Sequence, residues 1–171
     1  TVSDYHELET ERQSSVFASL LHIPWRNYKI NIIDTPGYDD FAGEVISALR
    51  VADTGVMILN AAMGVEVGTA IIWECTDKFK PPTLFVVNKI DLDDADFDKT
   101  LRDAKAHFGA NVVAVQYPVQ TGAGFNSIVD VLNMVMYKFG PQGGKPEKLP
   151  IPDNEKEKAD QIVIGTRPGH H

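Results

Sequence analysis

Two short polar stretches could bind a metal ion and a phosphate, and each directly follows an apolar run. The first is "DTPG", Asp34 to Gly37, and the second is "NKID", Asn88 to Asp91, so their first residues lie 88 − 34 = 54 positions apart. An aspartate at the end of a strand is placed to hold Mg²⁺ through water. Gly37 has no side chain, so its backbone N–H can approach a terminal phosphate.

The second stretch carries groups that suit a guanine base. The Asp91 carboxylate can accept two hydrogen bonds, from the N1–H and the amino group of guanine, whereas adenine lacks both donors at those places. A site built around such a pair can reject the wrong partner by roughly 10⁴-fold. Asn88 and Lys89 would brace the base and the loop. A plain β-turn and a polar strand exit are the alternatives, but the two motifs in order at strand ends favour a nucleotide site.

The elements that position these motifs alternate between strands and helices. Strands are expected at 16–25 (closed by Pro24), 28–34, 54–62, 83–91 and 111–119, and helices at 39–53, 67–80, 94–109 and 126–140. The continuous apolar run 54–62 is typical of a strand covered on both faces. This alternation implies parallel crossovers. We therefore predict an α/β fold, a mostly parallel sheet with helices on both faces, whose ligands bind beyond the carboxyl ends of the strands.

The two polar ends of the chain are expected to carry little regular structure. Residues 1–15 have no apolar face and predict a loop or a short exposed helix. Residues 141–158 are rich in proline, glycine and charge, which predicts a loop or linker with one short edge strand near Ile151.

Composition limits the number of domains, the cellular compartment and the kinds of partner that we expect. The chain has 171 residues and a formal net charge of −8, which suits one domain and does not favour non-specific binding to nucleic acid. The single cysteine, Cys75, excludes an internal disulfide, suits a reducing cytosol and is expected to be a small buried residue of a helix. No apolar run approaches the roughly 18 residues of a membrane span, so we expect a cytoplasmic protein without membrane contact.

The chain resembles the GTPase domain of translation elongation factor G over roughly residues 1–159. "DYHELETERQSSV" is similar to the first switch of that family, and "INIIDTPGYDDFAGEVISALRVAD" to its second switch and following helix. "GVEVGTAIIWECTDKFKPPTLFVVNKID" is similar to the next helix, strand and base-recognition loop. The resemblance implies a P-loop NTPase-like G domain that binds GTP or GDP with Mg²⁺. It also implies that the complete protein acts in translation and contacts large-subunit RNA of the ribosome.

One departure from the family concerns the phosphate loop. The sequence contains no G-x-x-x-x-G-K-[ST] motif, and "GPQGGKP", Gly140 to Pro146, is rejected because it follows a predicted helix and ends in proline. The family places that loop and its strand upstream of Thr1. We therefore expect an internal fragment that lacks the phosphate-loop strand and is inactive alone. The two strands that would flank the missing one are left without their usual neighbour, which predicts an irregular sheet or self-association.

The resemblance also divides the chain. Residues 1–117 would be a partial GTP-binding domain, from the first switch through the base-recognition loop. Residues 118–160 would begin the inserted subdomain of the family, which "GANVVAVQYPV" enters, and residues 161–171, ending in "GTRPGHH", would be a tag remnant.

The first-switch segment carries an altered metal ligand. The family has "RGIT" there, and its threonine reaches Mg²⁺, whereas the aligned residues here are Arg12, Gln13, Ser14 and Ser15. Ser15 keeps a hydroxyl, so the resemblance assigns it beside Asp34 as a metal ligand. Gln13 replaces the glycine, which makes the backbone less free.

Tyr38 stands where the family usually has a histidine that orients the attacking water. A phenol with a pKa near 10 is a poor base at neutral pH, and loss of a positioned acid–base group costs about 10²–10⁴ in rate. One interpretation is a catalytic position with slow hydrolysis. The other is that Tyr38 packs on the first-switch strand while another group orients water.

These observations predict a GTP-binding domain fragment of a ribosomal translocation factor, with GTP hydrolysis in the complete protein. The alternative in the same family is a hydrolysis-deficient module that binds ribosomes in a nucleotide-dependent way. A further alternative is an interaction domain that never binds nucleotide.

Overall fold

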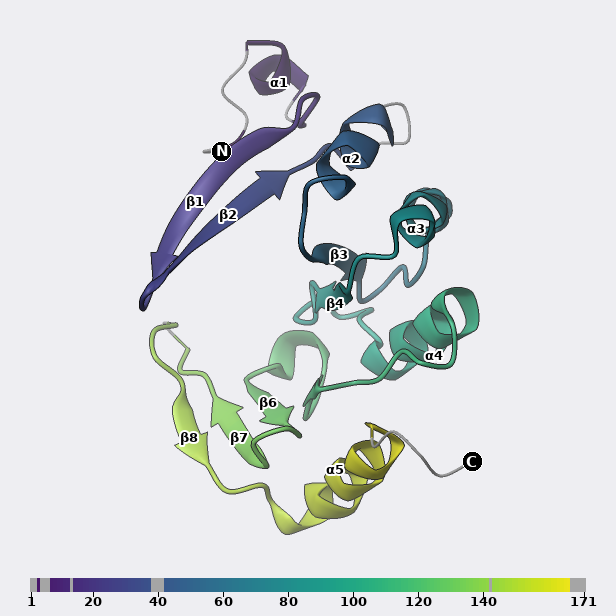
Figure 1. The fold of residues 1–171 in the computed structure, drawn as a ribbon. Coiled ribbons are helices and arrows are strands. Elements are labelled where there is room, and N and C mark those ends of the chain that lie inside the picture. The colour runs from purple at the N-terminus through teal and green to yellow at the C-terminus, as the bar shows by residue number, and fades with distance from the viewer. Residues whose placement is uncertain (1–2, 4–6, 13, 38–41, 142, 167–171) are drawn as a thin grey trace. The chain divides into compact units, whose positions relative to one another are not determined.

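The computed structural model describes residues 3, 7–12, 14–37, 42–141 and 143–166. In chain order its elements are α1 (Glu7–Arg12), β1 (Ser19–Trp25), β2 (Tyr28–Asp34), α2 (Ala42–Leu49), β3 (Gly55–Asn60), α3 (Val67–Phe79), β4 (Thr83–Asn88), α4 (Phe97–Phe108), β5 (Gln116–Pro118), η2 (Gly122–Gly124), β6 (Ser127–Asp130), β7 (Val135–Lys138), β8 (Glu147–Leu149) and α5 (Asp153–Thr166) (Figure 1). They form two compact units, Thr1–Met57 with Glu66–Phe85 (unit 1) and Ile58–Val65 with Val86–His171 (unit 2). In the described part of the chain, no helix has both the length and the apolarity needed to cross a bilayer.

Unit 1 contains a long antiparallel hairpin made of β1 and β2 (Figure 1). Its register runs from Ser19 opposite Asp34 to Trp25 opposite Tyr28. Arg26 turns the chain with a left-handed φ of 54°. Pro24 was expected to close the first strand, yet it lies inside the pairing, opposite Lys29. Proline is tolerated there because β1 is an edge strand, on which a missing N–H leaves no ladder partner unsatisfied.

The strands β3 and β4 pair in parallel, as predicted. The Gly55 N–H donates to the Pro82 carbonyl and the Ala61 N–H to the Asn88 carbonyl, both at 2.9 Å, and the offset 82 − 55 = 88 − 61 = 27 is constant only for a parallel pair. On one face α3 packs through Trp73 against Phe85 of β4, with ring centroids 5.7 Å apart.

The expected cover on the other face of β3 is not found among the described residues. Val56 and Ile58 keep 61% and 63% of their surface exposed, whereas the alternate residues Met57 and Leu59 are buried. Cys75, expected to be buried in α3, is only half-buried. The apolar run was correctly placed in a strand, but its burial depends on elements that a local pattern does not contain.

Strands β2 and β3 belong to two separate two-stranded sheets. Among the described strands, β2 is hydrogen-bonded only to β1, and β3 only to β4. Within unit 1 a cavity of about 820 Å³ is lined by residues of β2, α2, β3 and α3, among them Ile30, Ile32, Val45, Val56 and Ile72. Unpaired strand edges beside an apolar cavity are a template for pairing with another chain.

The first testable prediction is that the chain alone self-associates. Light scattering at increasing concentration should give a mass above the 18.9 kDa of one chain, and Val56→Lys should lower it because an edge lysine opposes strand addition. Glu66→Lys, an exposed change ahead of α3 that is absent from the cavity lining, is the matched control. A mass that stays at one chain over the whole concentration range would refute this prediction.

Unit 2 contains a four-stranded antiparallel sheet in the order β5-β6-β7-β8. Its core joins the sheet to α4 and α5 through seven buried residues: Phe97, Tyr117, Val129, Val131, Met136, Ile151 and Ala159. The Tyr117 hydroxyl donates to the Glu155 carbonyl at 3.2 Å, and burial, with the Glu155 carboxylate nearby, raises the pKa of Tyr117 well above its usual value.

Several predictions for this part of the chain are wrong. The helix expected at 126–140 is the hairpin β6–β7, and the strand expected at 111–119 is confined to β5. Residues 141–158, predicted to form a loop or linker, contain β8 and the start of α5. Strand β8 supplies the edge strand that was expected near Ile151. The sheet was expected to be mostly parallel, but β5 to β8 pair antiparallel, so among the described strands only β3 and β4 are parallel.

Asp130 explains why residues 126–140 turn instead of continuing as a helix. One carboxylate oxygen accepts the backbone N–H groups of Leu132 and Asn133, each at 3.0 Å, and the other accepts the Asn133 side-chain amide at 2.9 Å. An aspartate bonded to the backbone two and three residues ahead favours a turn over a helix. Burial raises the pKa of Asp130, but these hydrogen bonds, with one from Gln116, outweigh burial and lower it overall.

The second prediction is that Asp130→Ala lowers the free energy of unfolding by about 1–3 kcal/mol at pH 7, because two backbone N–H groups lose their charged acceptor. The folded pKa is lowered, so the carboxylate contributes stability above its unfolded pKa, about 3.9, and loses it as pH falls through the folded value. The difference between variant and wild type in urea unfolding should therefore shrink towards pH 3. The exposed Asp94→Ala serves as control and should change stability by less than about 0.5 kcal/mol.

Candidate functional site

The first polar motif follows β2 directly. Asp34 is the last residue of β2 and is half-buried, opposite Ser19 of β1. Pro36 is fully buried, which fixes the turn, whereas Gly37 is exposed. A Cβ added at Gly37 would meet no atom within 4 Å. Packing within the described residues therefore does not demand glycine here, and the open space leaves its backbone accessible to a ligand.

Tyr38, the proposed catalytic position, lies outside the described residues. The described helix, α2, begins at Ala42 and buries Val45 and Ala48. The prediction of a helix after the motif is confirmed.

A buried glutamate organises the segment before β1. Glu9 of α1 is fully buried, and its carboxylate accepts the backbone N–H groups of Val16 at 3.0 Å and Phe17 at 3.1 Å. Its carbonyl accepts the Ser14 N–H at 3.2 Å. Ser15 is half-buried within this clamped loop. A buried carboxylate is retained when it is hydrogen-bonded, so Glu9 holds the backbone on both sides of the predicted metal ligand.

A second glutamate joins this segment to the helix that follows the motif. Glu44 of α2 accepts the Ala18 N–H at 2.9 Å, directly before β1. The loop that carries Ser15 and the helix that follows Asp34 are therefore tied together within unit 1. Neither Glu9 nor Glu44 could be singled out from the sequence, since both resemble ordinary solvated acidic positions.

The second polar motif follows β4 and lies in unit 2. Asn88, Lys89 and Asp91 are exposed, and Lys89 has a left-handed φ of 60°. The carbonyl of Asn88 accepts the Ala61 N–H at 2.9 Å, and the carbonyl of Ile90 accepts the Gly122 N–H at 2.8 Å. Backbone anchors therefore lie on both sides of the left-handed residue.

The Asp91 side chain is open to solvent, and no hydrogen bond or ion pair to it occurs within the described residues. Its acceptor oxygens are available for a donor pair such as N1–H and the amino group of guanine.

The donor set around the first motif suits a hard cation. Among the described residues, no group of three or more histidine, cysteine or acidic side chains forms a metal centre by itself. Mg²⁺ is usually bound by one or two protein oxygen ligands together with water and phosphate oxygens. Asp34 and Ser15, both in unit 1, offer a carboxylate and a hydroxyl of that kind.

Residues 1–150 match the family described as the elongation factor Tu GTP-binding domain. The chain belongs to this family. The match covers β2, β4 and both polar motifs, so the predicted elongation-factor resemblance, the GTP-binding domain and the α/β G-domain fold are confirmed.

Relatives of this GTP-binding domain include two kinds of translation factor. Elongation factor G of Mycoplasma pneumoniae is 35% identical over 165 residues, which covers 95% of this chain and 24% of that protein. The mitochondrial ribosome-releasing factor 2 of Drosophila yakuba is 41% identical over 134 residues, covering 78% of this chain and 19% of that protein. A crystal structure from Thermus thermophilus matches 97% of this chain and 24% of its own with a TM-score of 0.88 and 25% identity. The chain thus spans a quarter or less of the length of these proteins.

Proposed function

We propose that the complete protein is a ribosomal translocation factor that binds and hydrolyses GTP. The observation that carries the proposal is the family match, within which "DTPG" and "NKID" both stand at strand exits, with Gly37 and Asp91 exposed. The ribosome, contacted through large-subunit RNA, is the proposed partner, because the relatives are named as an elongation factor and a ribosome-releasing factor. We place this activity in the cytoplasm.

Each site residue has a separate role in the proposal. Asp34 and Ser15 hold Mg²⁺, which when bound neutralises charge on the phosphates. The Gly37 N–H donates to the terminal phosphate, and Asp91 accepts from the guanine edge, braced by Asn88 and Lys89. Tyr38 orients the attacking water or leaves that role to another group.

The phosphate loop and its strand are proposed to come from outside these 171 residues. The sequence carries no such motif, and β2 and β3 each keep an edge that no described strand pairs with; together with the cavity in unit 1, these edges support an additional strand. In this arrangement residues 1–117 form part of the GTP-binding domain and residues 118–160 begin an inserted subdomain.

A second candidate function is the release of ribosomes, because the Drosophila yakuba ribosome-releasing factor shares more identity with the chain, although over a shorter stretch. Both candidates use the same nucleotide site. They differ in which ribosomal complex accelerates hydrolysis.

Single-turnover GTP hydrolysis by the complete protein, with and without ribosomes, tests the proposal. A translocation factor should be stimulated by pre-translocation ribosomes and should move the messenger RNA by one codon. Stimulation only on post-termination complexes, with separation of subunits, would favour release. GTP binding without hydrolysis on either complex would favour the hydrolysis-deficient module, and absence of GTP binding would refute all three.

A further inference from the structure

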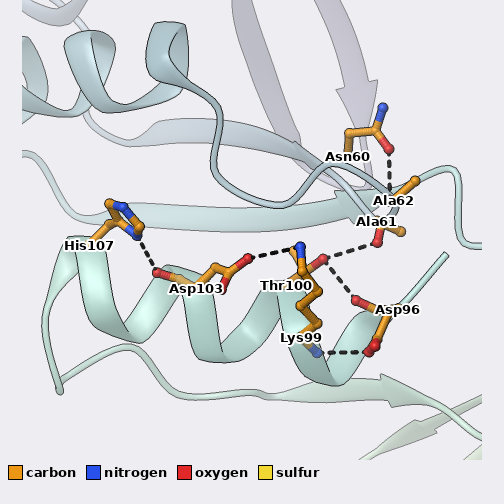
Figure 2. Close-up of polar contacts among 8 residues, drawn as sticks. All are labelled: Asn60, Ala61, Ala62, Asp96, Lys99, Thr100, Asp103 and His107. Carbon is orange, nitrogen blue, oxygen red and sulfur yellow. Dashed lines mark hydrogen bonds and ion pairs between the residues drawn. The ribbon is translucent and has the colours of Figure 1, made fainter. Parts of the chain in front are cut away.

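The turn that follows β3 is packed on α4, as Figure 2 shows. Asn60 closes the turn in two ways, since its side chain accepts the Ala62 N–H at 2.9 Å and its carbonyl accepts the Gly64 N–H at 2.8 Å. Gly64 has a left-handed φ of 72°, and a Cβ there would lie 2.6 Å from a carboxylate oxygen of Asp103. The Asp103 carboxylate of α4 therefore lies against the turn, and the left-handed backbone of Gly64 favours glycine there.

Ala61 connects this turn to the base-recognition motif. Its N–H donates to the carbonyl of Asn88, the first residue of that motif, at 2.9 Å. Its carbonyl accepts the Asp96 N–H at 2.9 Å and lies 3.2 Å from the Thr100 hydroxyl (Figure 2). Ala61 and Thr100 are each only 1% exposed, so water does not compete for these bonds. One buried residue, Ala61, thus joins the first turn of α4 to the end of β4.

Thr100 is placed to stabilise that connection. Its hydroxyl also lies 2.9 Å from the Asp96 carbonyl one turn earlier, so its single hydrogen is shared between two acceptors. A helical threonine ordinarily bonds only the carbonyl four residues before it. Asp96 caps the same helix, because its carboxylate accepts the Lys99 N–H at 2.8 Å. The helix start and the Ala61 carbonyl are therefore held as one unit.

The motif itself needs such support. Lys89 has a left-handed φ, which a residue with a Cβ adopts only when its surroundings enforce it. The two carbonyls that flank it, of Asn88 and Ile90, are those bonded by Ala61 and Gly122. If the hydrogen bond from the Ala61 N–H to the Asn88 carbonyl is weakened, we expect Lys89 to relax from its left-handed φ. The loop that carries Asp91 would then follow a different path.

We propose that Thr100 is a positioning residue for base recognition, which acts through Ala61 to fix the Asn88–Asp91 loop in the geometry that distinguishes guanine. The inference rests on the proposed function. It gives Thr100, a buried residue of α4 that does not contact the base, a part in nucleotide specificity.

The test compares three variants of the complete protein: Thr100→Val, Thr100→Ser and Thr76→Val. Thr76 is the matched control, because it is also buried in a helix but its hydroxyl donates only to its own helix, to the Ile72 carbonyl at 2.9 Å. Dissociation constants for GDP and inosine diphosphate, which lacks the amino group, are measured well below the unfolding temperature. Thr100→Val should lower the preference for GDP about threefold, the low end for loss of one hydrogen bond. Thr100→Ser and Thr76→Val should keep the wild-type preference.

Hydrogen exchange of the Ala61 amide provides a readout independent of nucleotide. Exchange should be faster in Thr100→Val and unchanged in Thr76→Val. Faster exchange with an unchanged nucleotide preference overturns the positioning role, and so does a loss of preference in all three variants. If the wild type itself does not prefer GDP, the proposed function fails instead, and the exchange result then reports only the structural connection.

Discussion

Asp91→Ala is expected to remove the preference of the complete protein for guanine over adenine nucleotides, lowering the discrimination by about 10³–10⁴-fold. The side chain is exposed at a strand exit and makes no hydrogen bond or ion pair within the described residues, so the substitution deletes acceptors for the base and little else. Titration with a fluorescent guanine nucleotide, competed with GTP or ATP, measures the effect.

The control for this prediction lies two residues further along the same loop. Asp93 is also exposed, and Asp93→Ala removes the same charge without touching the proposed acceptor. It should leave the discrimination within about twofold. Equal GTP affinity in Asp91→Ala and wild type would show that this loop does not bind the base.

Tyr38→His is expected to raise ribosome-stimulated GTP hydrolysis by the complete protein at least about tenfold. Histidine has an unperturbed pKa near 6.5 and can orient water or stabilise developing charge, whereas tyrosine is a poor base at neutral pH. GTP affinity should stay nearly constant, because Gly37 and Asp91 are unchanged, so the gain appears in turnover. Ser15 and Gln13 set an upper limit, since metal binding and switch closure depend on that segment.

A single-turnover assay with saturating ribosomes decides between the two interpretations of Tyr38. Tyr28→His, a change at an exposed position at the start of β2, is the control and should leave the rate unaltered. Rates of Tyr38→His and wild type that agree within twofold would assign Tyr38 a packing role.

The strands that carry the two motifs could be predicted from sequence because their signal is local. β2, β3 and β4 are apolar runs bounded by turn residues, and α4 has a capping aspartate, Asp96, and a glycine, Gly109, at its ends. Residues 126–140 were predicted wrongly because their apolar spacing fits a helix. The hydrogen bonds of Asp130 and the pairing of β6 with β7 select the hairpin. Such tertiary contacts outweigh local periodicity.

In the candidate site, too, some residues could be predicted from local sequence and others could not. Asp34, Gly37 and the Asn88–Asp91 loop stand at strand exits and could be found by motif and position alone. The long-range contacts near the candidate site could not, because Glu9 bonds residues seven and eight positions away, Glu44 one 26 positions away, and Thr100 one 39 positions away. A polar residue in a single sequence gives no sign of a partner at that distance.

The most direct test of a guanine-nucleotide site is nucleotide competition on the complete wild-type protein. The protein is loaded with a fluorescent GDP analogue and challenged with unlabelled GTP or ATP in the presence of Mg²⁺. We expect GTP to displace the analogue at near-stoichiometric concentration, whereas a roughly thousandfold excess of ATP does not. Displacement by ATP as readily as by GTP, or no binding of the analogue at all, would contradict the proposed guanine-nucleotide site.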